Sequence, residues 1–183
     1  MFFEFLYWTV GRLIKWIFRL QPEGLENLPR HGVLLCPNHA SNWDPVLIGV
    51  CLPHNYHLRI MAKEALFHNK ALAWLIRKLG AFPVTRGTAD IQSVKTAMQV
   101  IKDGQNLLIF PEGTTIRNGL GYVDGLPPHA HSGIAVIGVR SGATLVPVFA
   151  DGPKKPFHKH RIIFGKPYTP VYTGRRGTSE EMQ

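Results

Sequence analysis

The sequence has few cysteines and lacks a nucleophilic serine motif, and both absences narrow the chemistry it can perform. Only two of its 183 residues are cysteine, Cys36 and Cys51, and both lie in apolar stretches. Neither a disulfide framework nor a Cys-x-x-Cys metal site is therefore expected, and an apolar setting disfavours a reactive thiolate. No Gly-x-Ser-x-Gly elbow occurs either, so we expect any nucleophile to be a hydroxyl group of a substrate.

Acidic residues are also scarce in this chain. Twelve Asp and Glu stand against 21 Lys and Arg, for a formal net charge of +9, and residues 152–176 include seven basic residues and no acidic one. This balance favours an anionic partner, which is a nucleic acid, a membrane surface or a phosphorylated ligand. The basic residues are not interleaved with the stacking aromatic residues typical of single-strand binders, so we expect no nucleic-acid partner.

No charge-free apolar run is long enough to cross a bilayer, although the first 20 residues, MFFEFLYWTVGRLIKWIFRL, are strongly apolar. On a helix their polar residues form a narrow stripe beside a wide apolar face. Spanning would place Arg12 near the bilayer centre at a cost of about 2.5 to 3.5 kcal/mol. Lying in the interface instead embeds Trp and Phe and directs Arg and Lys toward headgroups.

We therefore expect an amphipathic membrane-association helix at residues 1–20. The alternative is a first helix that packs against the protein core. Because the basic residues follow the apolar run and no small-residue cleavage site appears, we expect this segment to be retained rather than removed as a signal peptide.

The remainder of the chain alternates short apolar runs with helical patterns and contains no internal repeat. This alternation predicts an α/β fold, a single layered domain with a mixed, mostly parallel sheet flanked by helices. We assign residues 21–170 to this domain and residues 171–183 to a short C-terminal tail. The pattern predicts strands at 32–36, 57–62, 81–85, 106–110, 143–150 and 161–164, helices at 45–52, 64–78, 88–102 and 130–140, and a turn at 22–30.

The stretch PNHASNWDP at residues 37–45 places His39 five residues before Asp44, just after a predicted strand. A carboxylate that accepts a hydrogen bond from one imidazole nitrogen fixes the tautomer, and the other nitrogen can then remove a proton from a hydroxyl. Five residues on a continuous helix lie about 140° apart, so a loop or helix start must bring the pair together. The purely structural alternative is a helix cap, with either Asp44 as N-cap before Pro45 or Ser41 as N-cap.

Two further strand ends carry polar residues. Arg86 follows the strand at 81–85, and FPEGTTIRNG covers the end of the strand at 106–110. Ligands of α/β sheets gather where loops leave the carboxyl ends of strands, so we expect both loops to open onto one cleft with His39. The second loop suits an anion nest with Arg117 close by, and Lys63 and Arg86 can add charge for a phosphate.

The alternative without a function is an ordinary polar turn for the FPEGTTIRNG loop and solvated surface charges for Lys63 and Arg86. His39, Asp44 and Glu112 show no ligand-spacing signature, so we expect no metal site.

Taken together and in this order, these residues resemble the glycerolipid acyltransferase family, the 1-acyl-glycerol-3-phosphate acyltransferases. The resemblance extends from about residue 5 to residue 170, and four ordered blocks are far more specific than any single one. The blocks are NHASNWD at 38–44, for the family form NHxSxxD; KEALF at 63–67 with GAFPVTR at 80–86; FPEGT at 110–114; and VPV at 146–148.

The resemblance implies an enzyme that transfers a fatty acyl group from an acyl thioester to the 2-hydroxyl of lysophosphatidic acid, giving phosphatidic acid. His39 is then the base and Asp44 orients it. The residues implied to hold the acceptor's glycerol phosphate are Lys63, Arg86, Glu112, Gly113, Thr114 and Arg117. The implied partners are membrane lipids, lysophosphatidic acid, and acyl-CoA or acyl-carrier protein as co-substrate, with no bound cofactor. The implied location is the cytoplasmic face of the cell membrane, as a peripheral protein.

Two departures from the family pattern concern the acceptor. The family usually has an Arg directly after Glu-Gly-Thr, where this chain has Thr115, and the loop at 119–133 is longer than usual, with His129 and His131 where lysines are common. The first alternative is therefore a related acyltransferase with a different lysolipid or an amine as acceptor. The second is a non-catalytic basic membrane-binding module, which has no need for the pairing of His39 with Asp44.

Overall fold

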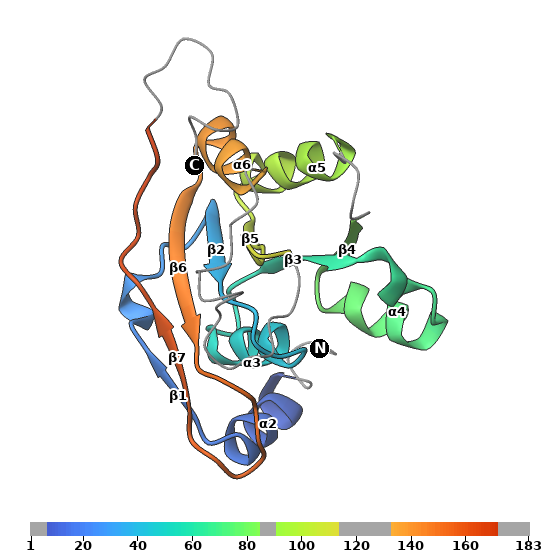
Figure 1. Cartoon of the computed structure of the whole chain (residues 1–183), viewed down its shortest axis with the longest axis vertical. Helices are drawn as coiled ribbons and strands as arrows, with labels where there is room; N and C mark the ends of the chain where they lie inside the picture. The colour runs from blue at the N-terminus through green and yellow to red at the C-terminus, as the bar shows by residue number, and fades with distance from the viewer. Residues whose placement is uncertain (1–6, 85–90, 114–132, 172–183) are drawn as a thin grey trace, which may run out of the picture.

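A seven-stranded sheet forms the centre of the protein in the computed structural model, which describes residues 7–84, 91–113 and 133–171 (Figure 1). The strand order is β1-β7-β6-β2-β5-β3-β4. Neighbouring strands are parallel except β6 and β7, which are antiparallel. The predicted mixed, mostly parallel sheet is thus confirmed. The strands are β1 Leu20–Glu23, β2 Val33–Pro37, β3 Leu58–Lys63, β4 Ala81–Val84, β5 Asn106–Leu108, β6 Thr144–Ala150 and β7 His160–Phe164.

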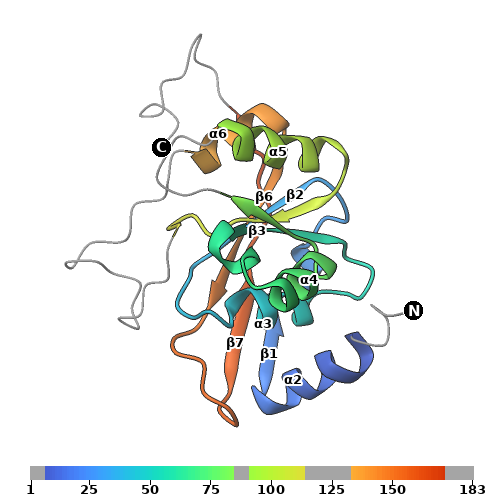
Figure 2. The ribbon, with the colours of Figure 1, turned by 90° about the vertical axis from the view of Figure 1, so that its right-hand side faces the viewer.

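Helices cover both faces of this sheet, as the two views show (Figures 1 and 2). Helices α5 and α6 lie on one side and α3 lies on the other. Successive residues of β2 point to opposite faces, so Leu34 packs in the cluster that holds the buried residues of α5 and α6, while Val33 and Leu35 pack with α3. The helices are α2 Arg12–Ile17, α3 Asp44–Cys51, α4 Lys70–Lys78, α5 Ile91–Lys102 and α6 Gly133–Ser141.

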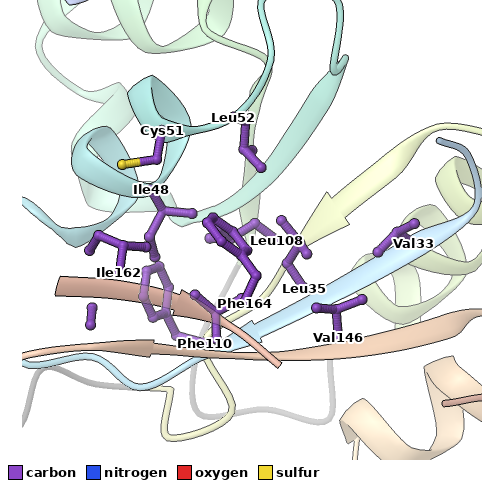
Figure 3. Close-up of a cluster of buried hydrophobic side chains, with 12 residues drawn as sticks. Val33, Leu35, Ile48, Cys51, Leu52, Leu108, Phe110, Val146, Ile162 and Phe164 are labelled. Carbon is purple, nitrogen blue, oxygen red and sulfur yellow. The ribbon is translucent and has the colours of Figure 1, made fainter. Parts of the chain in front are cut away.

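The core on the α3 side is built from residues far apart in the sequence (Figure 3). Ile48 and Leu52 pack against strand residues such as Leu35, Val146 and Phe164, and all five are at most 2% exposed. Burial of this kind contributes about 1.5 to 3 kcal/mol per large apolar side chain. This packing fixes helix α3 against one face of the sheet.

Two parts of the sequence-based assignment are wrong. The predicted turn at 22–30 begins with strand β1, which contains Pro22 and pairs in parallel with β7 at the edge of the sheet. An edge strand tolerates proline, and its partner is remote in sequence, so no local apolar pattern marks it. The predicted helix at 64–78 is interrupted. A 3-10 turn at Glu64–Phe67 precedes α4, and the extended Asn69 between them caps α4 by accepting a hydrogen bond from the Leu72 amide at 3.1 Å.

The N-terminal helical segment consists of a π-helical turn, Tyr7–Gly11, followed by α2. It stops at Phe18, which is buried, and Arg19 has a positive φ of 41°. In the ranges that the structure describes, no helix combines the length and apolar character needed to cross a membrane. Residues 1–6 of the predicted first helix, residues 88–90 and 130–132 of two others, and most of the predicted tail lie outside the described residues, and the division into segments at 20 and 170 stays a prediction.

Candidate active site

The loop that carries His39 leaves the carboxyl end of β2 and is attached to β6 by a side chain. The Asn38 amide donates from Nδ2 to the Ala150 carbonyl at 2.9 Å and accepts from the Ala150 amide at Oδ1 at 2.7 Å. Asn38 thereby extends the parallel ladder between β2 and β6 by one residue through its side chain. This attachment fixes the direction in which the chain enters the site.

His39 and Asp44 form a buried pair at this point. His39 Nδ1 lies 3.3 Å from Asp44 Oδ2, and the two residues are 9% and 0% exposed. The same carboxylate oxygen accepts the Ser41 backbone amide at 2.7 Å, and the His39 ring stacks on Phe110 with centroids 4.0 Å apart. The imidazole is therefore held on one edge and one face, and its second nitrogen, Nε2, lies at the edge that does not face Asp44.

Of the two capping alternatives, Asp44 as N-cap is wrong. Helix α3 begins at Asp44 itself, and its N-cap residue is Trp43, whose side chain makes no capping hydrogen bond. Ser41 is not the N-cap residue either, although its Oγ accepts the Trp43 amide at 3.2 Å. The Asp44 carboxylate turns back onto His39 and the Ser41 amide instead. A helix start therefore brings the two residues together, as the spacing of five required.

Glu112 contacts the His39 backbone through its carboxylate. Its Oε2 accepts the His39 amide at 3.1 Å. Burial raises the pKa of Glu112, while the hydrogen bond from the His39 amide works against that shift. Gly113 follows with a positive φ of 63° and donates its amide to the Phe110 carbonyl at 3.1 Å. The loop after β5 therefore supports the His39 loop directly.

The sheet order brings the predicted strand ends to one edge. Strands β2, β5, β3 and β4 are adjacent and parallel, so their carboxyl ends face the same way. Lys63 is the last residue of β3 and is exposed there. Arg86, Thr114 and Arg117 lie outside the described residues, so their predicted role stays a prediction.

Sequence reasoning missed Lys154, whose side chain is fully buried. Its Nζ lies 3.6 Å from Asp44 Oδ1 and 3.4 Å from Asp151 Oδ1, and it donates to the Gly152 carbonyl at 3.0 Å. In the sequence this lysine is one of seven basic residues in the segment 152–176, and nothing local distinguishes it from its exposed neighbour Lys155.

The cysteines do not provide a nucleophile. Burial raises the pKa of both the Cys36 and the Cys51 thiols to about 12. Two surface cavities, of about 480 and 330 Å³, are lined by α4 residues and by the loop between β6 and β7, and neither includes His39 or Asp44 in its lining. Within the described parts of the chain, no group of three or more His, Cys, Asp or Glu residues is arranged to hold a metal ion.

A buried histidine and carboxylate at the strand ends of an α/β sheet, with no reactive thiol beside them, are suited to general acid–base chemistry on a bound substrate. Comparison with known proteins identifies the class of protein. A family model described as Acyltransferase matches residues 19–151. The chain belongs to this family and is an acyltransferase.

Individual relatives agree with this assignment. The chain is 34% identical over 149 residues to the 1-acyl-sn-glycerol-3-phosphate acyltransferase of Bacillus subtilis, a match that covers 78% of this chain and 70% of that protein. It is 28% identical to the enzyme of the same name from Streptococcus pneumoniae, with 70% and 45% covered. It is 32% identical to the lyso-ornithine lipid O-acyltransferase of Pseudomonas aeruginosa, with 59% and 40% covered.

A solved structure shares the fold. The crystal structure of the 1-acyl-sn-glycerophosphate acyltransferase from Thermotoga maritima matches with a TM-score of 0.69 over 98% of this chain and 75% of that one, at 20% identity.

Proposed function

We propose that this chain transfers a fatty acyl group from an acyl thioester to the 2-hydroxyl of 1-acyl-glycerol-3-phosphate and so makes phosphatidic acid. The observation that supports this most is the contact of His39 Nδ1 with Asp44 Oδ2 at 3.3 Å, inside the segment that matches the family. The names of the Bacillus and Streptococcus relatives suggest the acceptor.

The chemistry needs one base and one orienting group. His39 Nε2 takes the proton of the acceptor hydroxyl as its oxygen attacks the thioester carbonyl carbon. A C–O bond forms, the C–S bond breaks, and the leaving thiolate receives the proton from the imidazolium, so that an ester and a thiol are released. Asp44 accepts a hydrogen bond from Nδ1 and stabilises the imidazolium. Positioned proton transfer of this kind contributes about 10² to 10⁴ in rate.

The acceptor's glycerol phosphate is proposed to lie over the strand ends, where Lys63, Arg86 and Arg117 supply positive charge. The loop at Gly113 and Thr114 is proposed to lie against it with the Thr114 amide as donor, because the Gly113 amide already donates to the Phe110 carbonyl. For Glu112 we propose support of the His39 loop, because its carboxylate already accepts the His39 amide and would repel a phosphate. The donor is proposed to be acyl-CoA or acyl-carrier protein, bound as a co-substrate, with no resident cofactor.

The test is to incubate membranes containing the protein with lysophosphatidic acid and either acyl-CoA or acyl-carrier protein, and to detect phosphatidic acid by mass spectrometry. His39→Ala should lower the rate by about 10² to 10⁴. His31→Ala replaces an exposed histidine outside the pair and should leave the rate unchanged. If neither donor gives product above the His39→Ala background, the proposed reaction is wrong.

A second acceptor merits a parallel assay, because the chain is 32% identical to an enzyme named for lyso-ornithine lipid. The same membranes are incubated with lyso-ornithine lipid in place of lysophosphatidic acid. Faster turnover of lyso-ornithine lipid, lost in His39→Ala, would keep the mechanism and change the acceptor.

We further propose that the enzyme binds the cytoplasmic face of the cell membrane through its N-terminal helix and the loop between β6 and β7. No residue of α2 is buried, which speaks against the core-packing alternative, and Trp8 and Trp16 are 51% and 67% exposed. Phe157 of the loop is exposed as well. Its φ of 64° is unusual for a bulky residue. Its amide donates to the Ile17 carbonyl and its ring packs edge-on against Trp16 with centroids 5.9 Å apart.

This exposed aromatic surface is bordered by basic residues, Arg12, Lys155 and Lys159, all exposed. Aromatic rings beside cationic side chains suit the interface of a bilayer containing anionic lipids. The combined substitution Trp16→Ala and Phe157→Ala should reduce sedimentation with anionic lipid vesicles. Tyr168→Ala is the matched control, because Tyr168 is also exposed but pairs with Leu145 near the other end of β6. Unchanged sedimentation of the double variant would contradict this attachment.

A further inference from the structure

We propose that Lys154 is a positioning residue for the catalytic pair: its buried ammonium holds Asp44 Oδ1, so that Oδ2 stays on His39 and on the Ser41 amide. The inference rests on the proposed role of His39 as base. It concerns a residue that no sequence motif identified.

The two oxygens of the Asp44 carboxylate have different surroundings. Oδ2 faces His39 Nδ1 and the Ser41 amide, whereas Oδ1 is buried and has no hydrogen-bond partner among the residues that the structure describes. The charged group facing Oδ1 is Lys154 Nζ at 3.6 Å, and neither side chain is exposed to solvent. A buried carboxylate oxygen with no compensating charge is costly, so the ammonium is what makes the fully buried carboxylate tenable.

The loop that carries Lys154 is itself fixed by polar contacts. Asp151 lies between Lys154 and β7: its Oδ1 faces Lys154 Nζ at 3.4 Å and His160 Nδ1 at 3.3 Å, and its Oδ2 accepts the Arg161 amide at 2.9 Å. The Gly152 carbonyl accepts from Lys154 Nζ. A row of charged or titratable groups therefore runs from His160 to His39 through Asp151, Lys154 and Asp44.

The position of Lys154 suits control of the charge on Asp44. A carboxylate that faces His39 alone would act on the imidazole with its full negative charge and hold the proton there. The Lys154 ammonium beside the other carboxylate oxygen weakens the attraction between the Asp44 carboxylate and the protonated imidazole. The imidazole can then release its proton again during turnover. Lys154 does not reach the reacting atoms, so its effect on the rate passes through Asp44.

The charged and titratable groups around this row come from several elements. They are Asp44 at the start of α3, Asp151 in the loop after β6, His160 on β7, Glu112 after β5, which meets the His39 amide, and Lys15 on α2, whose field acts on Cys51 at the end of α3.

The first test is kinetic. Lys154→Met should lower kcat by about 10-fold or more with little change in KM, at a temperature where a melting curve shows that the variant is folded. Lys102→Met, which removes an exposed charge at the end of α5, should leave kcat unchanged. Lys154→Gln keeps a hydrogen-bond donor on a side chain one atom shorter but loses the charge, and it replaces Lys154→Met if that variant does not fold. Wild-type kcat in a folded, uncharged variant would overturn the proposal.

A double-mutant cycle shows whether Lys154 acts through Asp44. With Asp44→Asn already in place, Lys154→Met should lower the residual rate by less than about threefold. An equal factor in both backgrounds would mean that Lys154 only supports the fold, and the proposal would fail.

A readout that needs no substrate keeps this inference separate from the proposed reaction. Imidazole ¹⁵N NMR, with the His39 signals assigned by comparison with His39→Ala, reports which ring nitrogen of His39 carries the proton. Because Lys154 is proposed to keep Asp44 Oδ2 on Nδ1, Lys154→Met should change the ratio of the two neutral His39 tautomers, and Lys102→Met should not. An unchanged ratio overturns the inference, even if the enzyme makes phosphatidic acid. A changed ratio in a protein inactive on lysophosphatidic acid supports the inference and refutes only the acceptor.

Discussion

The attachment of the His39 loop to β6 by Asn38 gives a prediction whose magnitude follows from the structure. Asn38→Ala removes both side-chain hydrogen bonds to the Ala150 backbone, at 2.7 and 2.9 Å, next to a residue that is 0% exposed. A buried polar group left without a partner costs about 1 to 3 kcal/mol. Asn38 itself is half-buried, so water can replace part of the loss, and we expect unfolding to become easier by about 3 kcal/mol.

That free-energy change should be visible in two measurements. For a domain of this size, 1 kcal/mol shifts Tm by about 2 to 4 °C, so the expected fall is about 6 to 12 °C. Urea unfolding followed by tryptophan fluorescence should show a lower midpoint at an unchanged m value, because the surface exposed on unfolding stays the same. Activity should also fall at temperatures well below Tm, because His39 directly follows the lost attachment.

Asn55→Ala is the matched control, since Asn55 is exposed; it should change the free energy of unfolding by no more than about 0.5 kcal/mol. The reasoning is refuted if Asn38→Ala is as stable as this control. A stable but inactive Asn38→Ala would show that the attachment directs the loop without contributing to the fold.

Three further predictions concern a glycine, the thiols and Glu112. Gly80 has a φ of 87°, and a Cβ placed on it would overlap the Leu58 carbonyl oxygen, whereas Gly104 has a φ of 73° but open space around it. In urea unfolding, Gly104→Ala should lower the free energy of unfolding by about 1 to 2 kcal/mol, and Gly80→Ala by about 1 to 3 kcal/mol more than that. Equal losses in the two variants would contradict the overlap. Burial raises the pKa of the Cys36 and Cys51 thiols to about 12, so iodoacetamide at about pH 8 should alkylate neither thiol in the folded protein and both thiols in urea. Intact-mass analysis measures the number of alkylated thiols. Rapid labelling without denaturant would contradict their burial. Burial raises the pKa of Glu112 above its ordinary value of 4.5, so the folded state binds this proton more tightly than the unfolded state. The stability of the wild type relative to Glu112→Gln should therefore fall as pH rises from about 4.5 through the raised pKa. Urea midpoints measured below and above this pH window check the sign, and a parallel pH dependence of the two proteins would contradict it.

The elements that the sequence predicted well are those whose pattern is local. A few neighbouring residues are enough to predict the apolar strands β2, β3 and β6 and the apolar face of helix α5, because strand and helix periodicity are local properties. The NHASNWD block likewise identified His39 and Asp44 before any geometry was known. Strand β1 could not be found in this way, because only its pairing with the remote β7 makes Leu20–Glu23 a strand.

The candidate active site likewise combines residues that the sequence alone identifies with contacts that depend on the fold. The sequence by itself determined the family, and it singled out the histidine and aspartate that we propose as base and orienting group. A histidine and an aspartate at this spacing, followed later in the chain by a Phe-Pro-Glu-Gly-Thr block, form a specific pattern that is visible without the fold. Only the tertiary structure decided what surrounds them. The Phe110 ring under His39, the Glu112 carboxylate on its amide and the buried Lys154 on Asp44 come from different strands and loops. Their contacts exist because the parallel order of β6, β2 and β5 brings three carboxyl ends to one edge of the sheet, and that order depends on packing over the whole chain.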